Sequence, residues 1–241
     1  MENRICKAFT LREYQDRSFL LEEYCGHGTL LDYVNAQKQA KAFNEVTVAF
    51  YTLEILSILL TIHNCGVIHG DIKPDNFLLM NDGELEGEWN AKGSASGWNK
   101  RGLKLIDFGR AIDLELYVQG AKQQFSGDNH AKEFQCIEMV QKKVWSFQID
   151  FYGVCGVIHC LLFHSFMQVA KKRLRSVSGE KYMPKSAFKR YWSFDWETLF
   201  VDFLNIPDEH SNHPDYYSQL LCKQICLLQQ FLATNASKVT M

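Results

Sequence analysis

The stretch Val67-Ile-His-Gly-Asp-Ile-Lys-Pro-Asp-Asn-Phe-Leu-Leu79 decides both the fold and the chemistry of this chain. It gathers an acid, a base and an amide, at Asp71, Lys73 and Asn76, in front of a short apolar run. A second motif, Leu105-Ile-Asp-Phe-Gly109, lies further along and also contains the end of an apolar run. Two such motifs in this order favour a catalytic site over ordinary loop carboxylates.

A long helix is predicted directly before the first motif. Apolar residues recur at helical spacing over 45–64, Asn44 is a suitable N-cap, and Gly66 suits the left-handed position past the helix end. Two short β-like runs, 77–80 and 103–106, contain the end of the first motif and the beginning of the second. We therefore expect a helix that leads into a small β-hairpin bearing both motifs.

The segment between these two runs, 81–102, is rich in Gly, Asn and Ser. Loops longer than about 12–15 residues are uncommon in compact domains, so this segment is predicted to be an insertion. Earlier in the chain, 18–25 is predicted to be a strand and 29–34 the start of a helix. From residue 148 onward the pattern predicts helices, over 149–167, 195–205 and 216–232.

Composition excludes several classes of protein. The 241 residues are 46% hydrophobic and 22% charged, which is typical of a folded domain rather than a disordered chain. A net charge of −2 gives no whole-molecule field for nucleic acid or an anionic membrane. The apolar stretch 155–169 is shorter than the ~20 residues of a membrane helix. The sequence therefore predicts a soluble intracellular protein with no membrane partner and with reduced cysteines.

The two motifs match the H-R-D-L-x-x-x-N and D-F-G patterns of protein kinases. Phosphoryl transfer from ATP depends on positioning and on neutralising charge around the γ-phosphoryl group. Asp71 would orient or accept the proton of the substrate hydroxyl, and Lys73 would meet the transferring phosphate. Asn76 and Asp107 offer the oxygen ligands that suit Mg²⁺. These four residues are the predicted catalytic residues, and the last two are the predicted metal ligands.

The remaining ATP contacts are expected on either side of the adenine ring. The backbone of 23–25 would form the hinge that hydrogen-bonds the adenine edge, and two apolar side chains would form the floor below it. The predicted ATP-binding residues are Glu23, Cys25, Lys73, Leu78, Ile106 and Asp107. Glu22 occupies the usually apolar back of this pocket, and an unpaired buried carboxylate is costly. We therefore expect Glu22 to face away or to have a partner.

Several segments have sequences that differ from those of most kinases. They are His69-Gly-Asp-Ile-Lys-Pro-Asp-Asn76, Phe134-Gln-Cys-Ile-Glu-Met139, Gln148-Ile-Asp-Phe-Tyr-Gly-Val154, Leu162-Phe-His-Ser-Phe-Met-Gln-Val169 and Phe203-Leu-Asn-Ile-Pro-Asp208. Together they resemble the Bub family of mitotic spindle-checkpoint serine/threonine kinases, from about residue 18 to about residue 232. The resemblance implies a kinase of the nucleus and the mitotic kinetochore. It also implies that a histone tail or checkpoint proteins are the substrates, and that upstream regions bind kinetochore partners.

The resemblance implies an α+β, protein-kinase-like fold with a mainly helical large lobe and a truncated N-terminal β lobe. In this interpretation 1–241 is one kinase domain, with 1–25 a remnant of the small lobe and hinge and 26–241 the large lobe. Upstream of the hinge there is no glycine-rich loop, and the only lysine is Lys7. Two hypotheses therefore stay open: an active kinase, or a catalytically weak or inactive kinase-like module that serves as a checkpoint scaffold.

Three further positions carry expectations. Gly70 stands where most kinases have the arginine that binds an activation-loop phosphate, so 107–138 is predicted to be ordered by packing rather than by phosphorylation. Asp150 resembles the kinase aspartate that braces the catalytic loop from below. The basic stretch 171–190 is a possible chromatin contact, and a solvated loop is its alternative interpretation.

Overall fold

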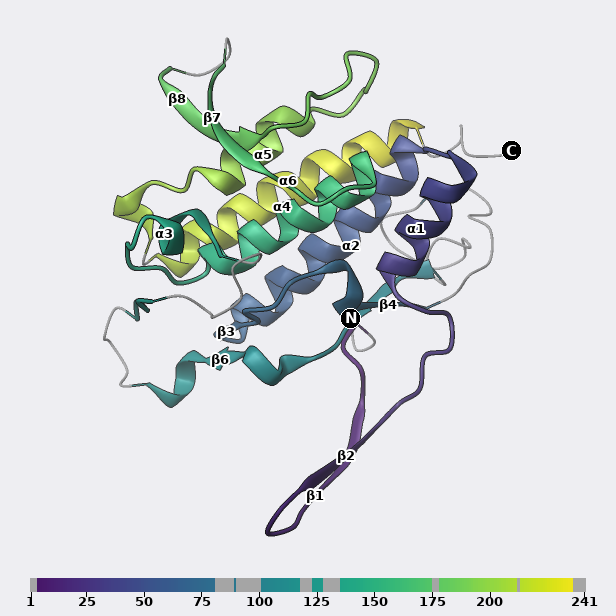
Figure 1. The fold of residues 1–241 in the computed structure, drawn as a ribbon, viewed down its shortest axis with the longest axis vertical. Coiled ribbons are helices and arrows are strands. Elements are labelled where there is room, and N and C mark those ends of the chain that lie inside the picture. The colour runs from purple at the N-terminus through teal and green to yellow at the C-terminus, as the bar shows by residue number, and fades with distance from the viewer. Residues whose placement is uncertain are drawn as a thin grey trace.

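Helices form the body of the molecule (Figure 1). The computed structural model describes residues 4–80, 89, 101–117, 123–127, 135–174, 178–211 and 213–235. In this part of the chain three long helices pack against one another, with α2 in contact with both of the others. They are α2 (Glu45–Asn64), α4 (Gln148–Phe163) and α6 (Pro214–Asn235). Three shorter helices flank them: α1 (Leu30–Ala40), α3 (Ile137–Val140) and α5 (Trp196–Leu204).

Helix α2 confirms the predicted capping. The Asn44 side chain accepts hydrogen bonds from the backbone N–H groups of Val46 and Thr47, at 3.0 and 3.2 Å. Gly66 takes the left-handed conformation, with a φ of +70°. The helix is long and apolar enough to cross a membrane by length and composition, but 78% of its most apolar window is buried inside the protein. Its apolarity on all faces is that of a core helix.

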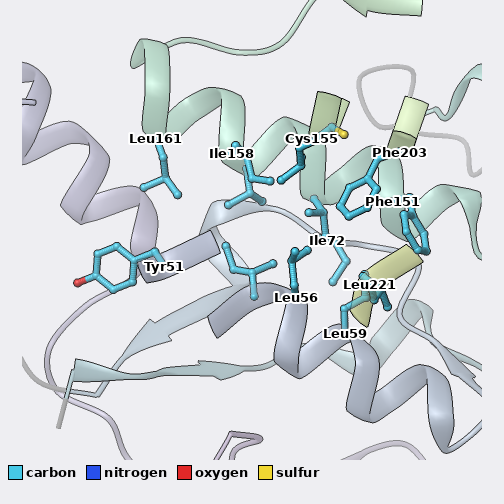
Figure 2. Close-up of a cluster of buried hydrophobic side chains, with 14 of the residues drawn as sticks. Tyr51, Leu56, Leu59, Ile72, Phe151, Cys155, Ile158, Leu161, Phe203 and Leu221 are labelled. Atoms are coloured by element: carbon cyan, nitrogen blue, oxygen red, sulfur yellow. The ribbon is translucent and has the colours of Figure 1, made fainter. Parts of the chain in front are cut away.

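The core lies between α2, α4 and α6, as Figure 2 shows. Its labelled members include Leu56 and Leu59 of α2, Phe151 and Ile158 of α4, Phe203 of α5 and Leu221 of α6. Ile72, from the motif loop 69–76, also points into this cluster. Full burial of each such side chain contributes roughly 1.5–3 kcal/mol. The motif loop is thus anchored to the hydrophobic core through Ile72.

The described strands form antiparallel pairs. The pairs are β1 (Ala8–Glu13) with β2 (Ser18–Glu22), β3 (Val67–Ile68) with β6 (Ile112–Asp113), β4 (Phe77–Leu79) with β5 (Leu103–Leu105), and β7 (Val169–Arg173) with β8 (Glu180–Pro184). The β4–β5 pair is the predicted motif hairpin. Of the predicted insertion between them, 81–88 and 90–100 lie outside the described residues.

The β1–β2 hairpin projects from the helical body (Figure 1). The predicted strand over 18–25 ends at Glu22, and its partner β1 was not predicted. Every side chain in both strands is exposed, including Phe9 at 57% and Leu20 at 55%. No element of the described chain covers this apolar ribbon.

The prediction that the chain is helical from residue 148 onward is wrong in one place. Helix α4 ends at Phe163 because His164 takes a left-handed conformation, with a φ of 51°. The following segment then forms the β7–β8 hairpin, in which Lys171 pairs with Tyr182. The basic stretch 171–190 therefore contains most of this strand pair and is not a simple loop. Helices α5 and α6 match the predicted spans closely, and Asp195 caps α5 by accepting from the backbone N–H of Thr198.

Candidate active site

The structure brings the ends of the two motifs together. The backbone N–H of Ile106 donates to the carbonyl of Asn76 at 3.0 Å, and the His69 Nε2 atom lies 3.0 Å from the carbonyl oxygen of Ile106. The β4–β5 pairing continues this contact, with Phe77 opposite Leu105. Asp107 therefore lies at the same edge of the hairpin at which the motif loop ends.

Asp71 is held firmly in the motif loop. Its side chain is 6% exposed, and its Oδ2 atom accepts from Lys73 Nζ at 2.7 Å. Asn76 Nδ2 donates to the Asp71 carbonyl at 2.8 Å and lies 3.3 Å from Oδ2. The Arg110 guanidinium lies 3.9 Å from Oδ1. A carboxylate with cations beside both oxygens keeps one orientation.

Arg110 was missed in the sequence analysis. The residue directly after Asp-Phe-Gly carries no fixed role in the motif, so its place in the chain offered no signal. The 3₁₀ turn Phe108–Arg110 brings its side chain back toward Asp71.

Asp150 braces the motif loop, as predicted. Its fully buried carboxylate accepts hydrogen bonds from the backbone N–H groups of His69 and Gly70, both at 2.8 Å. His63 Nε2, from the last turn of α2, lies 2.9 Å from the same carboxylate. One aspartate thus joins α4, α2 and the motif loop.

Gly70 has a conformational role that the sequence did not reveal. Its φ is +74°, and a Cβ atom built on it would lie 2.8 Å from the backbone carbonyl oxygen of Arg110. An arginine at this position would need a different backbone conformation. The glycine therefore determines how closely the motif loop approaches the segment after Asp107.

Gly70→Ala should destabilise the protein by about 1–3 kcal/mol, because a left-handed residue with a side chain costs about 1–2 kcal/mol and the carbonyl contact adds to it. Urea unfolding of the whole chain measures the change. Gly156→Ala is the matched control: it lies within α4 and its added Cβ would meet nothing within 4 Å. The control should be neutral or stabilising by up to ~1 kcal/mol, and equal losses in both variants would contradict the role of Gly70.

Asp107 and Asn76 present the oxygens expected of a cation site. Asp107 lies in the left-handed region (φ 64°, ψ 67°), accepts from Gly109 N–H at 3.3 Å and is exposed. The Asn76 amino group is engaged by Asp71, so a cation would bind its Oδ1 atom. The following Phe108 ring packs edge-on against His69, at 5.0 Å between ring centres.

The expected adenine side of the site is also assembled around the β4–β5 pair. Leu78 forms a bridge with Thr29, and Leu79 N–H donates to the Gly28 carbonyl at 3.0 Å. Leu78 and Ile106 are half-buried. The segment after β2 therefore lies beside Leu78, one of the two predicted floor residues.

The acidic residues of this segment have different environments. Glu22 is exposed, so its carboxylate is not buried at the back of the predicted pocket. Glu23 forms an ion pair with the buried Lys104 of β5, and this hydrogen bond lowers the pKa of the Glu23 carboxyl. Lys104 was not singled out from the sequence, because an isolated lysine within an apolar strand gives no pattern.

A cavity of about 420 Å³ opens beside Asp71. It lies between the motif loop, α4 and the segment 166–168. Gly153 and Gly156 of α4 line the helix side, and Phe166 and Met167 line another wall. The cavity is thus mainly apolar with ionisable groups at one end.

The structure describes part of the segment 107–138, which was predicted to be ordered by packing. Phe125 and Trp145 form a backbone bridge, and Trp145 Nε1 donates to the Gly127 carbonyl at 3.0 Å. The same prediction covers 118–122 and 128–134, which lie outside the described residues. Cys136 is buried, and burial raises the pKa of its thiol to about 12, so it is a poor nucleophile.

The comparisons with known proteins agree with this geometry. A protein kinase domain model matches residues 1–225, and the chain belongs to the protein kinase family. Within that family it is a Bub-type kinase domain. The BUB1 mitotic checkpoint serine/threonine-protein kinase of Arabidopsis thaliana is 41% identical over 194 residues, which are 80% of this chain and 36% of that protein.

Two further relatives support this placement. The BUB1 mitotic checkpoint kinase of Mus musculus is 36% identical over 208 residues, 85% of this chain and 18% of the relative. The crystal structure of the BubR1 kinase domain has a TM-score of 0.69 and 32% identity, covering 92% of this chain and 63% of that one. The predicted α+β kinase fold is confirmed. The chain spans 18–36% of the length of these curated relatives and of the BUB1 checkpoint kinase of Saccharomyces cerevisiae.

Proposed function

We propose that this chain transfers the γ-phosphoryl group of ATP to serine or threonine hydroxyls of proteins. The observation that carries the proposal is the joined pair of motifs, in which Ile106 N–H binds the Asn76 carbonyl beside the fixed carboxylate of Asp71. The family membership supports the same reaction.

Asp71 is proposed to orient the substrate hydroxyl and to accept its proton. The flanking Lys73 ammonium, 2.7 Å from Asp71 Oδ2, would neutralise negative charge on the transferring group. Arg110, on the other side of the carboxylate, would hold Asp71 in position. Proton transfer of this kind typically contributes roughly 10²–10⁴-fold to rate.

The donor set fits Mg²⁺ and ATP. A carboxylate on Asp107 and an amide oxygen on Asn76 are hard oxygen ligands of the kind that hold Mg²⁺ together with substrate phosphates. Bound Mg²⁺ would neutralise phosphate charge. Adenine would lie on Leu78 and Ile106, against the backbone of Glu23 to Cys25, with Lys73 and Asp107 at the phosphate end. These assignments rest on the half-burial of both floor residues and on the bridge between Leu78 and Thr29.

The cavity beside Asp71 is proposed to bind the protein substrate. Its opening next to the proposed base would place the phosphoacceptor within reach of Asp71. The apolar walls from Gly153, Phe166 and Met167 would accept an apolar side chain close to that hydroxyl.

The test is phosphoryl transfer by the whole chain, with ATP radiolabelled at the γ-phosphate and histones as acceptors. We expect label on serine or threonine that requires Mg²⁺, and Asp107→Ala should lower the incorporation at least tenfold because a metal ligand is lost. Equal incorporation by wild type and Asp107→Ala would refute the metal role. A wild-type chain that neither binds MgATP nor transfers label would favour the non-catalytic scaffold instead.

The cellular role is proposed from the relatives, which are named as mitotic or spindle assembly checkpoint kinases. We place this chain in the same checkpoint, in the nucleus and at mitotic kinetochores. Its substrates would be a histone tail or checkpoint proteins, with kinetochore partners bound through regions outside this chain. We propose a chromatin contact through the exposed lysines and arginines of the 171–190 stretch, which are Lys171, Arg173, Lys185, Lys189 and Arg190.

The domain division is proposed in the same terms. Residues 1–25 would be the remnant of a small lobe with the hinge, 26–241 the large lobe and 81–102 an insertion. The fully exposed β1–β2 hairpin supports a remnant, because two strands alone rarely form a stable unit in water.

A further inference from the structure

Three metal-ligating side chains meet at the base of the β1–β2 hairpin. Cys6 precedes β1, and Glu23 and Cys25 follow β2. One ligand atom from each residue lies within 4.8 Å of those of the other two. Cys6 is buried, and the other two are half-buried. The proposed nucleotide contacts of Glu23 and Cys25 use backbone groups, so these side chains have no part in them.

The backbone fixes this convergence. Glu23 N–H donates to the Lys7 carbonyl at 2.9 Å, which closes the hairpin base. Cys6 N–H donates to the Leu105 carbonyl at 3.4 Å, which ties the incoming chain to β5. The three donors are therefore brought together by chain segments that are themselves held in place.

We infer that Cys6, Glu23 and Cys25 bind one thiophilic divalent cation, of which Zn²⁺ is the representative. Zinc takes thiolate at ~2.3 Å and carboxylate oxygen at ~2.0–2.2 Å, so tetrahedral ligand atoms lie roughly 3.6–3.8 Å apart. The observed spacing requires side-chain shifts of about 1 Å. Water would complete the fourth position. Two sulfur ligands select zinc over the Mg²⁺ of the kinase site.

The charges around the cluster suit such a complex. Ligation replaces the two thiol protons, which are released, by the metal. Two thiolates, one carboxylate and Zn²⁺ leave a net charge of −1, and the buried Lys104 ammonium beside Glu23 compensates it. Glu23 has two oxygens, so it can bind Lys104 through Oε1 and the metal through Oε2.

A disulfide is the chemical alternative at the same place. The Glu23 carboxylate lies within 4.8 Å of both thiols and supplies a third donor that a disulfide would not use. This third donor favours a metal site over a disulfide.

Cobalt titration of the reduced, metal-free chain tests the inference. Co²⁺ reports tetrahedral thiolate ligation through visible d–d bands and a near-ultraviolet charge-transfer band. We expect these bands to saturate at about one Co²⁺ per chain and to vanish when Zn²⁺ is added. Cys6→Ser and Cys25→Ser should each abolish the charge-transfer signal or weaken binding at least tenfold, and Glu23→Gln should weaken it about tenfold.

The chain offers a matched control. Cys222 and Cys226 are exposed cysteines one turn apart on α6, so the double variant Cys222→Ser/Cys226→Ser removes a second pair of neighbouring thiols. This variant should keep the full cobalt signal. The inference is overturned if the double variant loses the signal, if the wild type shows none, or if peptide mapping finds a Cys6–Cys25 disulfide that the reductant does not open. Circular dichroism checks folding, and Cys25→Ser, at a half-buried position, remains decisive if Cys6→Ser misfolds.

Discussion

Asp71→Asn should lower the rate of phosphoryl transfer by about 10²–10⁴-fold while MgATP affinity and stability change little. The amide keeps the size and one acceptor oxygen of the carboxylate, so Lys73 and Asn76 retain a partner. It cannot take the proton of the substrate hydroxyl. Initial rates of label transfer measure the loss, and a separate binding titration measures MgATP affinity.

Two comparisons make this prediction specific. Asp215→Asn changes an exposed aspartate in the first turn of α6 and should leave the rate unchanged. Asp107→Ala should weaken Mg²⁺-dependent ATP binding, which Asp71→Asn should not do. If Asp71→Asn and Asp107→Ala weakened ATP binding equally, the two carboxylates would not have the separate roles proposed for them.

The sequence was informative where a local pattern has one structural solution. Asn44 before an apolar helix predicted the cap that the structure shows. The apolar runs at 77–80 and 103–106 predicted β4 and β5, because short strands flanked by motif loops leave little choice of pairing. Asp150 was predicted through the kinase resemblance, and its hydrogen bonds to the motif loop confirm it.

The sequence failed where a contact joins distant segments or depends on a dihedral angle. Gly70 was interpreted as a lost arginine, whereas its positive φ and the nearby Arg110 carbonyl explain why a glycine fits there. Lys104 and Glu23 form an ion pair although they are far apart in the sequence, so no local pattern predicts it. The β7–β8 hairpin follows an apolar helix and has a basic first strand, so periodicity alone did not separate it from the helix.

These outcomes explain why the fold was more predictable than the details of its site. The motifs specify which side chains meet, since Asp71, Lys73 and Asn76 belong to one loop. Their exact environment comes from residues that the motifs do not mention, such as Arg110 beside Asp71. A site built on a loop therefore needs tertiary contacts to fix its electrostatics.

Asp150 makes three of these tertiary contacts, with His63, His69 and Gly70. Asp150→Ala should destabilise the chain by about 3–5 kcal/mol, because it leaves the buried N–H groups of His69 and Gly70 without an acceptor and also removes the partner of His63. A loss of this size is a large fraction of the stability of an ordinary domain. Urea or thermal unfolding of the whole chain measures it.

Asp150→Asn and Asp75→Ala separate the possible causes. In the first variant the new amide would keep one acceptor oxygen but turn an amino group toward one of the N–H donors, so an intermediate loss is expected. Asp75 is an exposed carboxylate in the same loop, and its removal should change stability by less than about 0.5 kcal/mol. Because Asp150 holds the backbone just before Asp71, the Asp150→Asn variant should also lose phosphoryl transfer at temperatures where it remains folded. A folded Asp150→Asn chain with full activity would show that the brace supports stability alone.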